Sequence, residues 1–296
     1  MRDSVRIVEV GPRDGLQNEA VVVSVATKLD LIRQLREAGL ATIEVGSFVS
    51  PKRVPQMADT DDVVRQLDLD GEIRYPVLVP NEQGMVAALA AGVREIAVFA
   101  SASETFSQKN INCSIEQSID RFRPVVEMAK ANHVAVRGYV SCVLGCPYEG
   151  KVAIDAVVSV SRTLTDLGCY EISLGDTIGI GTPWQARDMM RAVAGDLDIA
   201  TLAAHFHDTR GQALANILAC LEEGVSVVDS AVGGLGGCPY APGAAGNVST
   251  EDLVFMLDGM GIHTGVDLSR VVAAGQFISA ALGKTSGSKV AQSMCA

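Results

Sequence analysis

Aromatic side chains are scarce in this 296-residue chain, at 4% of the total, whereas the hydrophobic fraction reaches 48%. The core must therefore be built from Val, Ile, Leu and Ala, which suits buried parallel strands. The chain contains no run of about 18 apolar residues, so we expect no membrane span. A chain of this length can bury a large core, and single α/β barrels commonly have about 250 residues or more.

Positive charge is also in short supply, because 24 Lys and Arg stand against 35 Asp and Glu and leave a formal net charge of -11. This balance argues against nucleic-acid or acidic-membrane binding over a broad face. A local cluster of Arg and Lys can still bind an anionic small molecule. We therefore expect a small-molecule partner, no nucleic acid and no membrane.

The seven cysteines are scattered and odd in number, which indicates reduced thiols rather than a disulfide framework. Cys142 and Cys146 have the spacing of a ligand pair, but no second pair matches them, and we expect structural roles for both. The N-terminus leads directly into an apolar segment and lacks the pattern of a signal peptide. We therefore expect a cytoplasmic protein of bacterial type.

Short aliphatic runs alternate with helical patterns along most of the chain. Four segments repeat the order of helix end, glycine and strand: EAGLATIEV, AAGVREIAV, DLGCYEISL and EEGVSVVDS. We expect strands at 6–10, 42–46, 73–79, 95–100, 135–141, 171–175, 201–207 and 225–232. We expect helices at 25–38, 60–67, 82–90, 115–131, 153–167, 183–193, 212–222, 250–258 and 269–282.

Repeated βα units of this kind predict an α/β fold, a (β/α)8 TIM barrel. A doubly wound open sheet is the alternative, but no G-x-G-x-x-G motif follows the first strand. We expect residues 1–266 to form the barrel domain. Residues 267–296 would form a C-terminal helical extension that packs on the barrel or at a dimer interface.

Histidine is rare, and two of the four histidines, His205 and His207, lie two residues apart where the seventh strand ends. Residues i and i+2 of a strand face the same side, so the two imidazoles point together, as a metal chelate needs. The active site of such barrels lies at the carboxyl ends of the strands. Asp14 follows the first strand and Asn247 follows the eighth, and both can join the histidines. Mixed nitrogen and oxygen ligands fit Mg²⁺ or Mn²⁺, and zinc remains an alternative.

Four further residues, at the ends of strands or in the loops that follow them, have either a chemical or a structural role. Glu44 and Asp176 end the second and sixth strands and are either site residues or structural carboxylates. Arg13, beside Asp14, is either a site cation or half of a surface pair. Cys238 lies in a glycine-rich loop, which can move and approach a substrate closely. Its thiol suggests proton transfer at the reacting carbon, the alternative being a cysteine that fills a turn.

The motifs VGPRDGLQNE, SASETFSQKNINCSIE, YVSCVLGCPYEG, LGDTIG, HFHDTRG, GGLGGCPYAPGAAGN and SKVAQ together resemble the hydroxymethylglutaryl-CoA lyase family nearly end to end. The Arg-Asp pair and the H-x-H pair are shared by a larger group of barrel metallolyases and Claisen-type synthases. The cysteine loop is narrower and looks like the lyases. The chain departs from the family at Ala20, where a basic residue is expected.

The resemblance implies a retro-Claisen cleavage of (S)-3-hydroxy-3-methylglutaryl-CoA into acetyl-CoA and acetoacetate, a reaction of leucine degradation and ketone-body formation that depends on a divalent cation. It implies that Arg13 holds the substrate and stabilises enolate charge, and that Cys238 is the catalytic thiol. The cation ligands implied by the resemblance are Asp14, His205, His207 and Asn247.

The resemblance also implies that Glu44 and Asp176 support the substrate site, and that Lys284 and Lys289 approach the phosphates of coenzyme A. It implies a homodimer. Three alternatives remain: a condensing synthase of the same group, a lyase for another 3-hydroxyacyl-CoA, and a non-catalytic metal-binding barrel.

Overall fold

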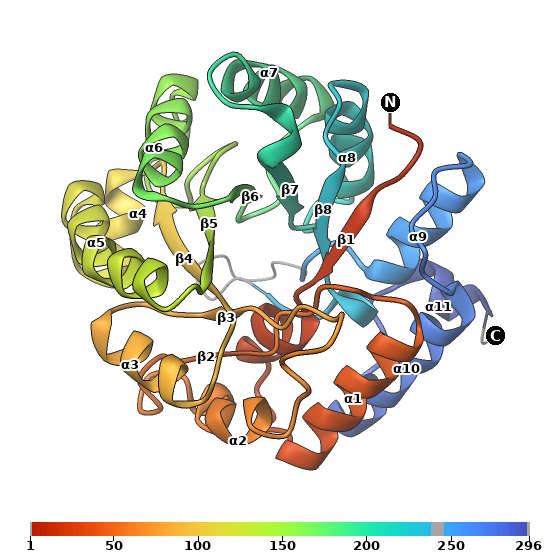
Figure 1. The fold of residues 1–296 in the computed structure, drawn as a ribbon. Helices are drawn as coiled ribbons and strands as arrows, with labels where there is room; N and C mark the ends of the chain where they lie inside the picture. Colours follow the sequence, from red (N-terminus) through yellow and green to blue (C-terminus); the bar gives the residue numbers. More distant parts are fainter. Residues whose placement is uncertain (1, 238–245, 295–296) are drawn as a thin grey trace.

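The computed structural model describes residues 2–237 and 246–294 of the chain. Eight parallel strands form one sheet in the order β1-β8-β7-β6-β5-β4-β3-β2, and helices surround it (Figure 1). The ring closes between the first and second strand segments, where the Glu9 amide donates to the Thr42 carbonyl at 3.0 Å and the Glu44 amide to the Glu9 carbonyl at 2.8 Å. The α/β barrel predicted by the repeated βα units is confirmed.

The strands of the barrel are β1 (Arg6–Glu9), β2 (Gly46–Ser47), β3 (Val77–Leu78), β4 (Glu95–Ser101), β5 (Ala135–Ser141), β6 (Glu171–Asp176), β7 (Leu202–Phe206) and β8 (Val227–Ser230). The helices between them are α1 (Val25–Glu37), α2 (Thr60–Val64), α3 (Glu82–Ala90), α4 (Glu104–Ile111), α5 (Ile115–Ala131), α6 (Ile154–Leu167), α7 (Pro183–Ala194) and α8 (Ala213–Glu222). Their buried faces are mostly aliphatic, as the scarcity of aromatic residues predicts.

The second and third strands are shorter than the sequence patterns predict. Thr42 and Ile43 pair with their neighbours only through isolated bridges, so β2 begins at Gly46. In the third segment Pro76 has no N–H and contributes only its carbonyl, which accepts from the Val45 amide at 3.0 Å. The aliphatic runs therefore correctly mark the chain segments of the barrel wall, but not the extent of regular pairing.

Helix α4 was not predicted, because its sequence is polar and carries no clear apolar stripe. The helix begins at a cap in which the Ser103 hydroxyl accepts from the Phe106 amide at 3.0 Å. It ends at Asn112, which adopts the left-handed conformation with φ 53°. A second unpredicted element is the π-helical turn η1 (Gly11–Gly15) directly after β1. Both elements contribute side chains to the cavity described below.

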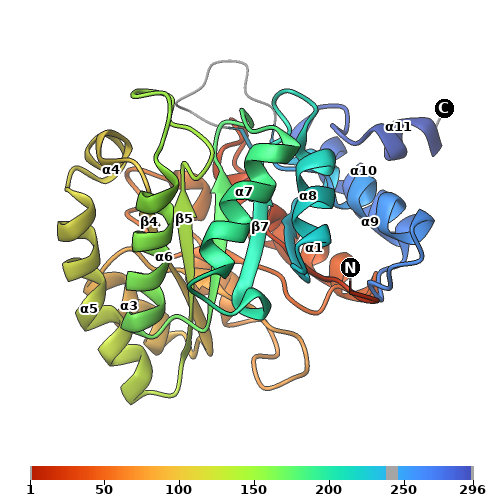
Figure 2. The ribbon, with the colours of Figure 1, turned by 90° about the horizontal axis from the view of Figure 1, so that it is seen from above.

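Helices α9 (Thr250–Gly259), α10 (Leu268–Leu282) and α11 (Lys289–Met294) follow the last strand and gather at one side of the barrel (Figures 1 and 2). Helix α10 packs against α1 and α9, and α11 packs against α9. The 3-10 turn η4 (Val232–Gly234) also contacts α10, so the C-terminal region supports the loop that follows β8. Within residues 2–237 and 246–294, no helix has both the length and the apolar character needed to cross a bilayer.

Candidate active site

Three ligand-type side chains converge at the carboxyl ends of the strands. His205 lies on β7 and His207 directly after it, and their ring centroids are 5.7 Å apart. Asp14 reaches the same place from η1. One ligand atom from each of the three residues lies within 4.8 Å of the other two. The structure thus brings together three of the four residues expected to bind a cation, from opposite ends of the sequence.

Arg13 joins this cluster through two charged hydrogen bonds. Its Nε donates to Glu44 Oε2 at 2.6 Å, and its Nη1 donates to Asp14 Oδ1 at 2.7 Å. The guanidinium also lies over the Tyr139 ring, 5.5 Å from the centroid. The turn η1 begins with Gly11-Pro12, and it directs both Arg13 and Asp14 toward the barrel interior. Arg13 is therefore a buried cation of the site and not half of a surface pair.

Neighbouring groups keep the Asp14 carboxylate charged. Burial alone raises the pKa of Asp14, but the Arg13 guanidinium, the two histidines and the Asn247 amide outweigh it and lower that pKa to about 2. Asp14 is therefore ionised at neutral pH. The pKa of Arg13 is raised because its attraction to Glu44 and Asp14 exceeds the effect of burial. Burial raises the pKa of Glu44, against the effect of Arg13.

A buried ion-pair network lies beneath His205, and the sequence analysis did not identify it. Asp229 on β8 accepts from both Arg137 nitrogens, at 2.7 and 3.0 Å, and from the Ser173 hydroxyl at 2.7 Å. His205 Nδ1 lies 3.1 Å from Asp229 Oδ2. Burial alone raises the pKa of Asp229, but Arg137 and His205 outweigh it and lower that pKa well below its usual range. The sequence did contain a signal of this network, because Asp229 is a charged residue within an aliphatic strand and a buried charge requires a partner.

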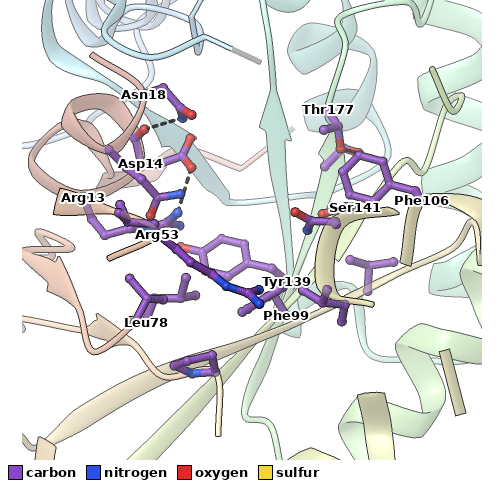
Figure 3. Close-up of a pocket in the computed structure, with 18 of the residues that line it drawn as sticks. Arg13, Asp14, Asn18, Arg53, Leu78, Phe99, Phe106, Tyr139, Ser141 and Thr177 are labelled. Carbon is purple, nitrogen blue, oxygen red and sulfur yellow. Dashed lines mark hydrogen bonds and ion pairs between the residues drawn. The ribbon is translucent and has the colours of Figure 1, made fainter. Parts of the chain in front are cut away.

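A cavity of about 730 Å³ opens over the cluster. Its polar end is formed by Arg13, Asp14 and the two histidines, and Figure 3 shows Arg13 and Asp14 on one side and Ser141 and Thr177 on the other. The remaining wall is mixed: apolar side chains such as Leu78 and Phe99 alternate with polar or charged ones such as Arg53, Asn110 and Arg121. The cavity is large enough for a small organic substrate, and its polar side chains can orient such a molecule.

Three other predicted site residues lie within the described part of the chain. Asn247 contacts the cluster, and its Nδ2 donates to Asp14 Oδ2 at 2.8 Å. Asp176 is buried and accepts from the Ile180 and Gly181 amides at 3.1 and 2.8 Å, so it shapes the loop after β6. Lys284 forms an ion pair with Glu19. Cys238 lies outside the described residues.

Two further buried carboxylates support the loops that carry the site. Glu9 Oε1 accepts from the Gly11 and Val232 amides at 2.8 and 2.9 Å, and its Oε2 accepts from the Thr250 hydroxyl at 2.6 Å. Glu251 accepts from the Gly233 amide. Burial raises the pKa of Glu9 to about 7 and that of Glu251 to about 8, and the hydrogen bonds oppose it only in part. These contacts link the start of η1 to the end of β8.

The residues at the site fit a divalent cation. Asp14 supplies an ionised carboxylate, and His205 and His207 supply two imidazoles at strand spacing. This set of one hard oxygen ligand and two nitrogen ligands is typical of first-row divalent metals and leaves positions for water or substrate.

Comparisons with known proteins agree with this geometry. Residues 4–278 match the family described as HMGL-like. The chain is 58% identical to the mitochondrial hydroxymethylglutaryl-CoA lyase of Rattus norvegicus, over 98% of this chain and 90% of that protein. The crystal structure of hydroxymethylglutaryl-CoA lyase from Pseudomonas aeruginosa aligns with a TM-score of 0.98 at 56% identity, over 100% of this chain and 98% of that chain.

A further relative binds ligands of the expected kind. An HMG-CoA lyase from Acinetobacter baumannii was solved in complex with coenzyme A and 3-methylmalate. It aligns with a TM-score of 0.94 at 39% identity and covers 98% of this chain and 95% of that chain. The resemblance noted in the sequence motifs is thereby confirmed. The chain is a carbon–carbon lyase and belongs to the hydroxymethylglutaryl-CoA lyase family.

Proposed function

We propose that this protein cleaves (S)-3-hydroxy-3-methylglutaryl-CoA into acetyl-CoA and acetoacetate, with Mg²⁺ or Mn²⁺ as its cation. The observation that carries the proposal is the convergence of Asp14, His205 and His207 beside the buried cation of Arg13, at the polar end of a cavity. The identity to hydroxymethylglutaryl-CoA lyases over nearly the whole chain supports the choice of substrate.

The reaction breaks one carbon–carbon bond and needs no oxidant or water. The C3 hydroxyl loses its proton, the C3–O bond becomes the ketone of acetoacetate, and the electron pair of the C2–C3 bond passes to C2. The resulting enolate of acetyl-CoA then takes up a proton at C2. The site must therefore favour loss of the hydroxyl proton, hold negative charge on the thioester oxygen and deliver a proton to C2.

We assign the holding of the cation to Asp14, His205 and His207, with Asn247 as a fourth ligand through its amide oxygen. A bound divalent cation makes the substrate hydroxyl more acidic and orients its oxygen atoms. Arg13 would stabilise the enolate oxygen. Its Nε and Nη1 are engaged by Glu44 and Asp14, which fix the guanidinium plane, and Nη2 is the donor we assign to the substrate.

We assign proton delivery at C2 to the Cys238 thiol. The preceding residue, Gly237, lines the cavity, and Asn247 beyond the cysteine loop contacts Asp14. These described residues on either side of positions 238–245 support our assignment of Cys238 to the site. A positioned acid of this kind contributes about 10²–10⁴ in rate.

The coenzyme A portion would extend toward the C-terminal region. Lys284 pairs with Glu19, which follows two cavity-lining residues, Gln17 and Asn18. We therefore propose that Lys284 binds a coenzyme A phosphate. Ala20, which lies next to Glu19 in the sequence, offers no charge where the family resemblance leads us to expect a basic residue. Glu44 and Asp176 would act on the substrate indirectly, through Arg13 and the loop after β6.

A coupled assay of acetoacetate release tests the proposed function. The protein is assayed with hydroxymethylglutaryl-CoA as purified, after EDTA treatment, and after Mg²⁺ or Mn²⁺ is restored. We expect activity to be lost with EDTA and regained with either metal. Cleavage that persists in EDTA would contradict the cation requirement. If acetyl-CoA and acetoacetate condense without measurable cleavage, the protein is a synthase instead.

We further infer a homodimer. Phe255 on α9 and Met294 on α11 are 59% and 51% exposed, and these two helices pack together. We assign these two exposed apolar side chains to the dimer contact that the family resemblance implies. Light scattering coupled to gel filtration tests the inference, and a monomer at micromolar concentration would contradict it.

A further inference from the structure

His205 and Asp229 face each other inside the barrel because β7 and β8 are paired in register at these two residues. Side chains at matched positions of neighbouring parallel strands point to the same side. His205 Nδ1 lies 3.1 Å from Asp229 Oδ2. On the other side of the ring, Nε2 lies 3.9 Å from Asp14 Oδ2, within the proposed cation site.

Asp229 can only accept a hydrogen bond in this arrangement. Both of its oxygens already receive N–H donors from Arg137, and Oδ2 receives the Ser173 hydroxyl as well. A carboxylate that accepts a two-point guanidinium contact is ionised. The proton between Asp229 and His205 must therefore belong to Nδ1 of the imidazole, and in a neutral ring Nε2 is then unprotonated.

We propose that Asp229 is a positioning residue for the cation site, which holds His205 in the Nδ1–H tautomer with the Nε2 lone pair directed at the cation. The inference rests on the proposed function, because it takes the cluster of Asp14, His205 and His207 as the reaction's cation site. Carboxylate acceptors of this kind orient ligating histidines in many metal proteins, and removing them typically weakens metal binding about 10–100-fold.

Arg137 holds Asp229 in place from the opposite side. Its side chain is fully buried, its Nε donates to Glu171 Oε1 at 2.7 Å, and its Nη1 donates to the Tyr139 hydroxyl at 2.9 Å. Arg6 pairs with the second oxygen of Glu171. The carboxylates of Asp229 and Glu171 are thus balanced by two guanidinium groups. This balance lets an anion remain buried beneath His205, which a lone carboxylate could not do.

A purely structural role for the network would be costly, since a buried ion pair is often no better for stability than apolar side chains of equal volume. Aliphatic residues such as Ile172, Leu174 and Val228 are fully buried on the opposite side of the same strands, because successive side chains of a strand alternate between its faces. The ion pair of Arg137 and Asp229 occurs at the point where Asp229 contacts the imidazole ring of His205, a proposed cation ligand. This placement supports a role in orienting His205.

The tautomer itself provides the first test and needs no variant. The chain has four histidines, so a ¹⁵N-histidine NMR spectrum of the metal-free protein is simple, and His205→Asn identifies the signal of His205. We expect Nδ1 of His205 to carry a proton, donated to Asp229. An Nε2–H tautomer in the metal-free protein would overturn the proposal.

Metal affinity provides the second test. Mn²⁺ is titrated into the metal-free protein by calorimetry or by EPR, for the wild type, Asp229→Asn and Glu95→Gln. Glu95 is the matched control, a buried carboxylate that binds Arg74 and Tyr170 away from the cation site. We expect a Kd for Mn²⁺ about 10–100-fold weaker in Asp229→Asn and unchanged in Glu95→Gln. Equal affinities in Asp229→Asn and the wild type would overturn the proposal.

Two further outcomes distinguish a failure of this inference from a folding defect and from a failure of the proposed function. If Asp229→Asn does not fold, Ser173→Ala removes one hydrogen bond from the carboxylate while Arg137 and His205 keep theirs, and we expect a smaller loss of Mn²⁺ affinity. An Mn²⁺ affinity unchanged in Ser173→Ala would then count against the proposal. If the wild type binds Mn²⁺ through an Nδ1–H His205 but does not cleave hydroxymethylglutaryl-CoA, the proposed function fails while the positioning role stands.

Discussion

Replacement of Arg13 by Met removes the guanidinium charge that we place beside the thioester oxygen. The substitution keeps an unbranched side chain of similar length. We expect kcat and kcat/KM to fall together by about 10²–10³, since removal of one preorganised donor to a developing oxyanion has this effect. KM should change little, because the interaction strengthens only as charge develops on the thioester oxygen. The measurement is acetoacetate release at saturating Mg²⁺.

The same substitution also changes stability, and the structure indicates how. Arg13 bonds to Glu44 at 2.6 Å and to Asp14 at 2.7 Å, and the Glu44 side chain is fully buried. Loss of the guanidinium leaves Glu44 without its cation, a change that typically costs about 3–5 kcal/mol in the free energy of unfolding. Glu44 is expected to take up a proton in response, because burial already raises its pKa.

Two controls separate catalysis from stability. The double variant Arg13→Met/Glu44→Gln removes the charge together with its partner, so its melting temperature should recover while kcat stays low. Arg74→Met, which breaks an ion pair with Glu95 away from the cavity, should keep near-normal turnover. If Arg13→Met changes KM alone, or if kcat in the double variant falls by less than about tenfold, the enolate role of Arg13 is wrong.

Three further predictions concern other parts of the chain. Cys238→Ser should lower kcat by about 10²–10⁴ and leave the Kd for Mn²⁺ unchanged, and near-normal turnover would remove the thiol from the reaction. Glu9 has a folded pKa of about 7 against an ordinary 4.5, so the folded state binds more protons and the free energy of unfolding falls as pH rises through this window. Chemical unfolding across pH 4.5–7 should show a shallower decline in Glu9→Gln, and an unchanged decline would contradict the burial argument. Gly39→Ala should lower the melting temperature more than Gly150→Ala. Both glycines have a left-handed φ, but only at Gly39 would the new Cβ lie 2.2 Å from the Gly265 carbonyl oxygen. Equal melting temperatures of the two variants would refute this reasoning.

Much of the site could be predicted because barrel topology turns chain position into spatial position. A residue that follows a barrel strand lies at the carboxyl-end face whichever strand it follows. Asp14 and the two histidines were therefore expected to meet although nearly 200 positions separate them in the sequence, and the structure brings them together. The expected role of Lys284 depended on family resemblance alone, whereas those of Cys238 and Asn247 followed from their positions after the eighth strand, and all three remain proposals.

Other features could not be read from the sequence. The sequence marks Asp229 as a buried charge, but its partner His205 is set only by the register of β7 and β8. Likewise, the burial of Arg13 depends on the π-helical turn η1 and on Glu44 from the segment that precedes β2. Helix α4 forms by capping and not by an apolar stripe, so periodicity does not reveal it.

The order of aliphatic and helical segments in the sequence was enough to predict the barrel. Hydrophobic periodicity and the position of the capping glycine are local properties, and each βα unit shows them independently of the others. The H-x-H spacing likewise determined that two imidazoles point together. Only the tertiary structure decided which charges pair, which carboxylates are buried and how His205 is oriented. These depend on distances between segments remote in the chain, and burial makes each such charge depend on a partner that the folded barrel alone supplies.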